Sequence, residues 1–317
     1  MTLQVPDLDL DLSDLTEAAW LSRLDALGDE HGFFERLGGS HAALFIEAGP
    51  RLLVTFETIE GARRSPSALP RGFEHVTRDG WSLLALLSRG ETWFRDPAVW
   101  RLFDRLTDDG FLEDFESTLF MGSGPSGYAA AAFSVAAPGA TVLALRPYAT
   151  LDPAIAGWDR RHLADRGRDW TTRYGYAPEM IEGAQRAYVL HDPGHAPDAM
   201  HAALFHRGNV TLLRCPFAGT RVEAMLDSMS ILPRIIDLAM VGALDRLTFA
   251  RLWRQRRLHA PYLRALLKRL EGEGRRGLAL RVCRHGMHTW DRPFFARKLD
   301  ELSDPASRAS PPDEAAE

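Results

Sequence analysis

The fold of this chain is decided by one stretch, Phe120-Met121-Gly122-Ser123-Gly124-Pro125-Ser126-Gly127-Tyr128-Ala129-Ala130. An apolar run over 116–121 leads into it and is typical of a buried strand. Glycine, proline and serine then mark a turn, and the small residues of 127–137 predict a helix. The stretch is therefore predicted to be a strand that enters a sharp glycine-rich turn and leaves it as a helix.

Strands and helices are predicted to alternate on both sides of this turn. The expected strands cover 42–47, 52–56, 81–87, 116–121, 141–145, 188–190 and 210–214. The expected helices begin at Pro97, cover 127–137 and 198–205, and begin again near Arg221. Such alternation predicts the α/β class, a mostly parallel sheet with helices on both faces.

The domain boundaries follow from changes in composition. Residues 1–35 form an acidic N-terminal segment, with nine acidic residues against Arg23. Residues 36–240 form the α/β domain, and the polar, aromatic stretch at about 152–184 is its predicted cap. Residues 241–303 are predicted to be a helical extension, and 304–317 a disordered tail.

Composition excludes several classes of protein. The 317 residues carry a formal net charge of −5, which argues against a global electrostatic grip on nucleic acid. Cys215 and Cys283 have no metal-site spacing, and residues 1–12 lack a signal peptide's pattern, so a cytoplasmic location is expected. Residues 117–145 carry no charge, but glycines and prolines interrupt them, so no membrane span is predicted.

The turn resembles bacterial members of the α/β-hydrolase superfamily, whose elbow reads roughly G-S-S-M-G-G-Y-A-A. The resemblance covers roughly residues 42–235 and includes the later segments Val142-Leu143-Ala144-Leu145-Arg146-Pro147 and Thr150-Leu151-Asp152-Pro153. It implies an α/β-hydrolase-like fold with a nucleophile elbow at the turn. The chemistry that it implies is acyl transfer through a covalent serine ester.

The departures from the family pattern predict a catalytically degenerate protein. The family's nucleophilic serine falls on Gly124, and the next residue, Pro125, lacks the backbone N–H that forms half of the oxyanion hole. Asp192 stands where the catalytic acid is expected, but Thr220 stands where the histidine is expected. The first hypothesis is therefore a degenerate hydrolase-like protein that binds a small molecule or a partner.

A second hypothesis keeps an active enzyme. In a shifted elbow Ser126 is the nucleophile, Gly127 supplies the N–H, and Asp192 acts with a recruited histidine, His195. The protein would then be an esterase, thioesterase or acyltransferase. Against this register, Tyr128 falls where the motif needs a glycine.

A small-molecule pocket is expected above the turn. The residues expected to form it are Gly122, Ser123, Gly124, Gly127, Tyr128, Thr220 and Trp158. The aromatic residues of the cap, Trp158, Trp170, Tyr174 and Tyr176, are equally explained as pocket walls or as packing. The turn lacks the lysine of a phosphate-binding loop, so no cofactor is expected.

The run His191-Asp192-x-x-His195 invites a metal interpretation, but its spacing promises no converging ligands, so no metal is predicted. A third hypothesis concerns 251–284, where eleven arginines and lysines oppose two glutamates. These are either solvated helix faces, which the acidic residues 1–35 of the same chain could meet, or a surface for a protein partner.

Overall fold

The computed structural model describes residues 10–290 and 293–304. The chain divides into two compact units, Met1–Arg246 and Leu247–Glu317. Of the tail predicted at 304–317, all but Asp304 lies outside the described residues.

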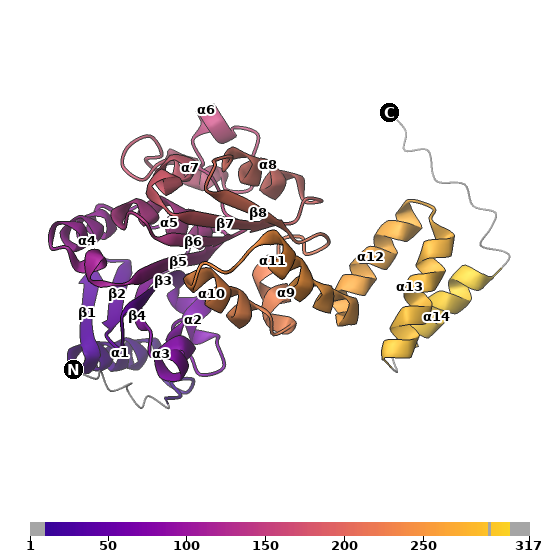
Figure 1. Cartoon of the computed structure of the whole chain (residues 1–317), viewed down its shortest axis with the longest axis horizontal. Helices are drawn as coiled ribbons and strands as arrows, with labels where there is room; N and C mark the ends of the chain where they lie inside the picture. The colour runs from indigo at the N-terminus through magenta and orange to yellow at the C-terminus, as the bar shows by residue number, and fades with distance from the viewer. Residues whose placement is uncertain (1–9, 291–292, 305–317) are drawn as a thin grey trace. The chain divides into compact units, whose positions relative to one another are not determined.

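The first unit is built on an eight-stranded sheet in the order β1-β2-β4-β3-β5-β6-β7-β8 (Figure 1). β2 runs antiparallel to both of its neighbours, β1 and β4, and all other neighbouring strands are parallel. The strands are β1 (Gly32–Leu37), β2 (His41–Ile46), β3 (Arg51–Thr58), β4 (Ser82–Ser88), β5 (Ser117–Ser123), β6 (Thr141–Leu145), β7 (Arg186–His191) and β8 (Val210–Arg214).

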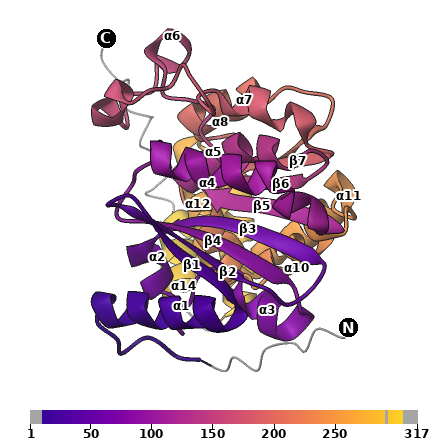
Figure 2. The same cartoon turned by 90° about the vertical axis from the view of Figure 1, so that its left-hand side faces the viewer.

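Helices connect these strands. They are α1 (Glu17–His31), α2 (Ile59–Arg63), α3 (Phe73–Asp79), α4 (Pro97–Asp108), α5 (Pro125–Phe133), α6 (Pro153–Ala156), α7 (Ala177–Met180), α8 (Ala196–Leu204), α9 (Val222–Ser228) and α10 (Leu232–Met240), with short 3₁₀ turns η1 (Phe111–Asp114), η2 (Ser134–Ala136), η3 (Leu163–Gly167) and η4 (Ile181–Gly183). In Figure 2, α4 and α5 cover one face of the sheet, whereas α1, α3 and α10 cover the other. The predicted fold class, a mostly parallel sheet between two helical layers, is confirmed.

The core lies between the sheet and the layer of α4 and α5. Val54, Phe56 and Phe120 on the strands belong to one buried cluster with Phe103 of α4 and Phe133 of α5. α5 comes close to the sheet because it is made of small residues, and a Cβ added to Gly127 would lie only 3.1 Å from the Leu145 carbonyl oxygen. The small-residue helix predicted from the sequence is therefore the one that packs against the turn-bearing strand.

Local sequence explains where α4 begins. Pro97 stands at its first position, and Asp96 is the N-cap, whose Oδ1 accepts a hydrogen bond from the Ala98 N–H at 2.8 Å. One of the two oxygens of Asp96 is left for other contacts.

One feature differs from the expectation. β1 was not predicted, because its residues are mixed in polarity and only Leu37 is fully buried. β3 is not a neighbour of β2 in the sheet, because β4 lies between them. The remaining predicted strands are present with their ends moved by at most two residues.

The second unit is helical. It contains α11 (Arg246–Trp253), which starts at the boundary, then η5 (Arg254–Leu258), α12 (Ala260–Gly272), α13 (Arg276–Thr289) and α14 (Pro293–Ser303). Its small core includes Leu267, Leu270, Ala279 and Cys283. In residues 10–290 and 293–304, no helix combines the length and the apolar character that a bilayer crossing requires.

Candidate functional site

The glycine-rich turn joins β5 to α5 at Gly124. This residue has φ 60° and ψ −123°, in the left-handed half of backbone space that favours glycine. Gly124 is buried and its N–H donates to the Leu145 carbonyl oxygen at 2.9 Å, which holds the turn against the end of β6. Pro125 is the first residue of α5, and Ser126 lies one position further into the helix.

Arg146, directly after β6, covers the turn. A Cβ built on Gly124 would lie 2.9 Å from Arg146 Nη2 and 3.6 Å from Arg146 Cζ. The guanidinium therefore occupies the space into which a side chain at position 124 would point. Arg146 itself has a positive φ of 50°, and its Nε lies 4.0 Å from Asp198 Oδ2.

A cavity of about 230 Å³ opens beside the turn, at the carboxyl ends of β3, β4 and β5. Open α/β sheets bind ligands at this edge. Gly122, Ser123, Pro125 and Ser126 form one side of the cavity. The rest of its lining is Phe56, Glu57, Thr58, Gly61, Arg71, Ser88, Glu91, Thr92, Trp93, Phe94, Met121 and Glu223.

The cavity carries an excess of carboxylates. Glu57, Glu91 and Glu223 line it, and among the described lining residues Arg71 is the one cation. Arg71 is already engaged, because its Nη2 lies 3.0 Å from Glu223 Oε1 and 3.5 Å from Asp227 Oδ2. The cavity therefore favours ligands that are neutral or positively charged.

Glu57, at the end of β3, is the most perturbed acid of the cavity. Burial raises the pKa of its carboxyl to about 7, while the Arg71 N–H, which donates to Glu57 Oε1 at 2.6 Å, opposes that rise. Near neutral pH this carboxyl is therefore able to accept or donate a proton. A second cavity of about 660 Å³ shares Glu57, Gly61 and Arg71 with the first.

Asp192, the residue in the acid position, lies directly after β7 and is buried. Its Oδ1 accepts from the Gly194 N–H at 2.8 Å, and its Oδ2 accepts from the Gly219 N–H at 2.7 Å. Asp192 thus contacts Gly219 in the loop after β8, directly before Thr220. The Thr220 side chain itself is exposed. The carboxylate binds backbone amides in that loop.

His195 pairs with a different acid. Its Nδ1 lies 3.1 Å from Asp198 Oδ2, whereas both Asp192 oxygens accept from backbone amides. Ser126 lines the cavity, but neither Asp192 nor His195 is among the cavity's lining residues. Among the described hydrogen bonds, none joins Ser126, Asp192 and His195 into a triad.

A second histidine–carboxylate pair is fully buried. His201 Nε2 lies 3.0 Å from Asp159 Oδ2, and His201 Nδ1 accepts from the Ala149 N–H at 3.1 Å. The amide contact assigns the ring proton to Nε2, which donates to Asp159. Both ring nitrogens are occupied, so this pair has a positioning role in the cap.

The aromatic residues of the predicted cap mostly pack. Tyr128 is fully buried, its hydroxyl donates to the Tyr174 carbonyl oxygen, and its ring lies 5.2 Å from that of Trp170. Trp158 is half-buried against His201, with ring centroids 4.7 Å apart. Neither Tyr128 nor Trp158 lines the cavity beside the turn.

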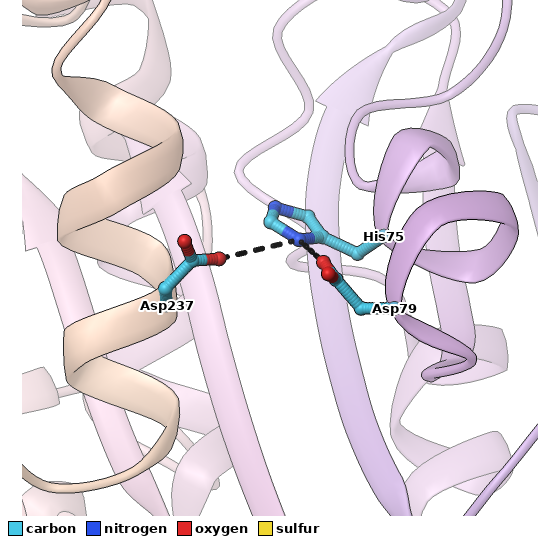
Figure 3. Close-up of side chains that lie close together, drawn as sticks. All are labelled: His75, Asp79 and Asp237. Atoms are coloured by element: carbon cyan, nitrogen blue, oxygen red, sulfur yellow. Dashed lines mark hydrogen bonds and ion pairs between the residues drawn. The ribbon is translucent and has the colours of Figure 1, made fainter.

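One group with metal-ligand character occurs in the part of the chain that the structure describes. His75 and Asp79 of α3 and Asp237 of α10 place one ligand atom each within 4.8 Å of one another (Figure 3). However, Arg78 Nη2 lies 2.6 Å from Asp79 Oδ2 and 2.9 Å from Asp237 Oδ1. This guanidinium already pairs with both carboxylates, and its hydrogen bonds lower the pKa of Asp79.

Sequence reasoning missed Glu57, Thr92 and Arg146. Glu57 could have been predicted as a site residue, since it directly follows an apolar strand whose carboxyl end faces the site. Nothing in the sequence marks Arg146 as a site residue, because its place over Gly124 depends on a positive φ that arginine rarely adopts. Nothing in the sequence marks Thr92 either, since its side chain is hydrogen-bonded to His41, 51 residues away in the sequence.

Comparison with protein-family models and with curated protein sequences finds no match. Comparison with solved structures finds matches of low identity. A capsule O-acetyltransferase of Neisseria meningitidis serogroup A is 15% identical, with a TM-score of 0.40, over 64% of this chain and 93% of that one. Est1E from Butyrivibrio proteoclasticus is 12% identical, with a TM-score of 0.41, over 66% and 98%.

A bacterial brefeldin A esterase is 12% identical, with a TM-score of 0.39, over 78% of this chain and 88% of that one. Likeness at this level says nothing about the chemistry of this chain. Its α/β-hydrolase-like fold stands on the chain's own strand order, its single internal antiparallel strand and its two helical layers.

Proposed function

We propose that this chain is a small-molecule-binding protein on an α/β-hydrolase-like fold, with a turn at 122–127 that supplies no nucleophile. The observation that carries the proposal is Gly124. It holds the left-handed conformation at the apex of the strand–turn–helix, and the Arg146 guanidinium lies where its side chain would be. In the hydrolase family the attacking serine stands at such an apex.

The neighbours of Gly124 support the same conclusion. Pro125 has no N–H to offer to an oxyanion, and losing one such donor costs about 100- to 1000-fold in rate. The residue at the histidine position is Thr220, and the acid Asp192 is engaged with backbone amides. Each of the parts that the family's mechanism needs at this turn is thus replaced or occupied.

The cavity supports the choice of ligand. Its volume of about 230 Å³ suits a molecule of a few heavy atoms, and its aromatic walls include Phe56 and Phe94. Its carboxylates outnumber its cations, and Arg71 is already paired with Glu223. The ligand class is therefore a small neutral molecule or a small organic amine, whose ammonium group Glu57 and Glu223 would accept.

Thermal-shift measurements with small primary and quaternary amines test the binding, each beside a carboxylic acid of the same size. We expect the amines to raise the melting temperature of the full chain. Glu57→Gln should abolish that rise, whereas Glu60→Gln, an exposed change on the neighbouring helix α2, should leave it intact. Equal stabilisation by amines and acids would reject the ligand class.

The inactive turn is tested with a fluorophosphonate serine probe on the wild type, Ser123→Ala and Ser126→Ala, with the labelled peptide mapped by mass spectrometry. We expect no label on residues 122–127. A label on Ser126 that disappears in Ser126→Ala would instead establish the shifted-elbow esterase, thioesterase or acyltransferase.

A second function, as an interaction protein, has one observation in its favour. Of the eleven basic residues at 251–284, only Arg269 and Arg275 form ion pairs with an acid among the described contacts, both with Glu273. The remaining charges suit an acidic protein partner. A complex held by them should weaken between 50 and 500 mM salt, roughly as screening lengths shorten from above 10 Å to below 5 Å.

A further inference from the structure

A hydroxyl, an imidazole and a carboxylate from three separate elements lie next to one another, and the hydroxyl lines the cavity. Thr92 lies in the loop between β4 and α4 and lines the cavity. His41 is the first residue of β2 and is buried. Asp96 is the N-cap of α4. None of the three belongs to the glycine-rich turn.

Thr92 and His41 lie within hydrogen-bond distance of each other. His41 Nε2 lies 2.7 Å from Thr92 Oγ1, which also accepts from the Phe94 N–H at 3.3 Å. The tautomer of His41 decides the direction of this contact. With the ring proton on Nδ1, the side that faces the Asp96 carboxylate, Nε2 is the acceptor of the Thr92 hydroxyl proton.

The carboxylate faces the other ring nitrogen. His41 Nδ1 lies 3.7 Å from Asp96 Oδ2, while Asp96 Oδ1 stays bound to the Ala98 N–H. Nδ1 is buried and makes no hydrogen bond to any residue that the structure describes. This distance is longer than a hydrogen bond, but in unliganded enzymes the contacts of a nucleophile, its base and the orienting group are often loose.

The environment keeps His41 neutral. Burial lowers the pKa of its imidazole, Asp96 opposes that shift, and Arg168 adds to it. A neutral imidazole whose Nε2 faces a hydroxyl is the form that a general base requires.

The loop that carries Thr92 is held in an unusual conformation. Trp93 and Phe94, the two residues after it, have φ values of 61° and 55°, which bulky residues rarely adopt. Both side chains are buried, and the Trp93 ring packs edge-on against Tyr148, with centroids 4.9 Å apart. Backbone strain of this kind persists only where the surrounding packing holds it in place, and it occurs most often at functional sites.

We propose that Thr92 is a nucleophile for acyl transfer in the cavity, with His41 as its general base and Asp96 as the residue that positions His41. The proposal rests on the function proposed above, since the cavity must admit a small molecule. It differs from the shifted elbow because the attacking oxygen comes from the loop after β4.

The reaction would proceed as follows. Thr92 Oγ1 forms a bond to the acyl carbon of an ester while its proton passes to His41 Nε2. The ester C–O bond then breaks, and the leaving alcohol oxygen takes the proton from Nε2. In the second step the oxygen of water, or of an acceptor alcohol, bonds to the acyl carbon while its proton passes to Nε2. The bond between the acyl carbon and Thr92 Oγ1 then breaks, and Thr92 Oγ1 takes the proton from Nε2.

The cavity restricts the substrate class. A volume of about 230 Å³ accommodates a short acyl group, and the carboxylates of Glu57 and Glu223 disfavour a negatively charged one. The acyl donor is therefore a small, uncharged ester, and an amino alcohol is the acceptor that fits the charge of the cavity.

The test uses p-nitrophenyl acetate with the full-length protein, followed by peptide mapping. We expect one acetyl group on the peptide that contains Thr92. Thr92→Val should lose it, Thr92→Ser should retain it, and His41→Gln should acetylate about 100-fold more slowly. Thr289→Val, on α13 of the helical unit, is the matched threonine control.

Asp96→Asn tests the positioning role. Asparagine keeps the N-cap of α4, so the helix should remain folded. We expect the acetylation rate constant to fall while the ester concentration at half-saturation stays unchanged. A fall in both Thr92→Ser and Thr92→Val to the same residual rate would indicate that the loop, and not the hydroxyl, is required, and would overturn the proposal.

Other outcomes also overturn it. Acetyl groups on Ser126 or only on surface amines, or an unchanged rate in Thr92→Val, exclude Thr92 as the nucleophile. If the amines still stabilise the chain through Glu57 in that case, the acyl-transfer inference fails and the binding function stands. If Thr92 is acetylated but amines do not bind, the proposed ligand class is wrong and the acyl-transfer inference stands.

Discussion

At the scale of single residues, the turn depends on glycines for two different reasons. Gly124 needs a positive φ, whereas Gly122 needs the absence of a side chain. A Cβ on Gly122 would lie far inside van der Waals contact with the Ser126 carbonyl oxygen, which is backbone and has little freedom to move. The sequence pattern revealed the turn but not these separate roles.

Gly122→Ala is therefore expected to lower the free energy of unfolding by about 1–3 kcal/mol, because the start of α5 must shift. Gly183→Ala is the control, since an added Cβ there meets nothing within 4 Å. It should change stability by less than about 0.5 kcal/mol. Chemical denaturation of both variants measures the difference, and equal stabilities would show that the turn tolerates a side chain.

Glu57 gives the pH dependence of stability a definite sign. Its carboxyl ionises near pH 4.5 in the unfolded chain and near pH 7 in the folded chain. Between these values the folded protein binds more protons, so this group makes stability fall as pH rises, and its contribution levels off above pH 7. Glu57→Gln should flatten that part of the curve in urea titrations at several pH values. An identical slope in the variant would place the titration on another group.

At the scale of elements, the strands were predictable where both faces are buried. Thr141–Leu145 is buried at every position and its bounds match the prediction. β1 is an edge strand with polar residues such as Glu35, whose partner Arg105 lies on α4, so its sequence shows no apolar run. Edge strands obtain their pairing from a neighbour, and that information is not local.

Asp192 connects two elements of the sheet edge, the loop after β7 and the loop after β8. Asp192→Ala would leave the Gly194 and Gly219 amides without their acceptor, at a cost of about 1–3 kcal/mol. Asp192→Asn keeps one acceptor oxygen and should lose roughly half as much. Hydrogen exchange should become faster at residues 215–221 in Asp192→Ala. Unchanged exchange there would mean that the loop after β8 is held by other contacts.

At the scale of the whole molecule, the two units have separate cores. The sheet core includes Phe120 and Phe133, and the helical unit has its own around Leu267 and Cys283. The change in sequence pattern predicts a helical extension over 241–303. The sequence could not predict the cavity, since Glu57, Thr92 and Ser126 meet only after strands distant in the sequence have paired.

Gly286→Ala tests this separation. Its Cβ would meet the ring of Phe295 at 2.5 Å, where α13 packs on α14, and the ring cannot bend away. We expect loss of hydrogen-exchange protection in α12, α13 and α14, with β5 and β6 unchanged. Equal loss of protection in the sheet would contradict the independence of the two cores.

The position of Arg146 over Gly124 has an evolutionary meaning. A mutation that introduced serine at 124 would place a side chain against the Arg146 guanidinium and strain the backbone. Pro125 would still offer no N–H, and, in the proposed alignment, Thr220 would still offer no base. No intermediate on this path would gain activity at the turn, so selection would not favour the first step. If the turn supplies no nucleophile, as proposed, new chemistry is therefore expected to arise at other positions around the cavity sooner than at residue 124.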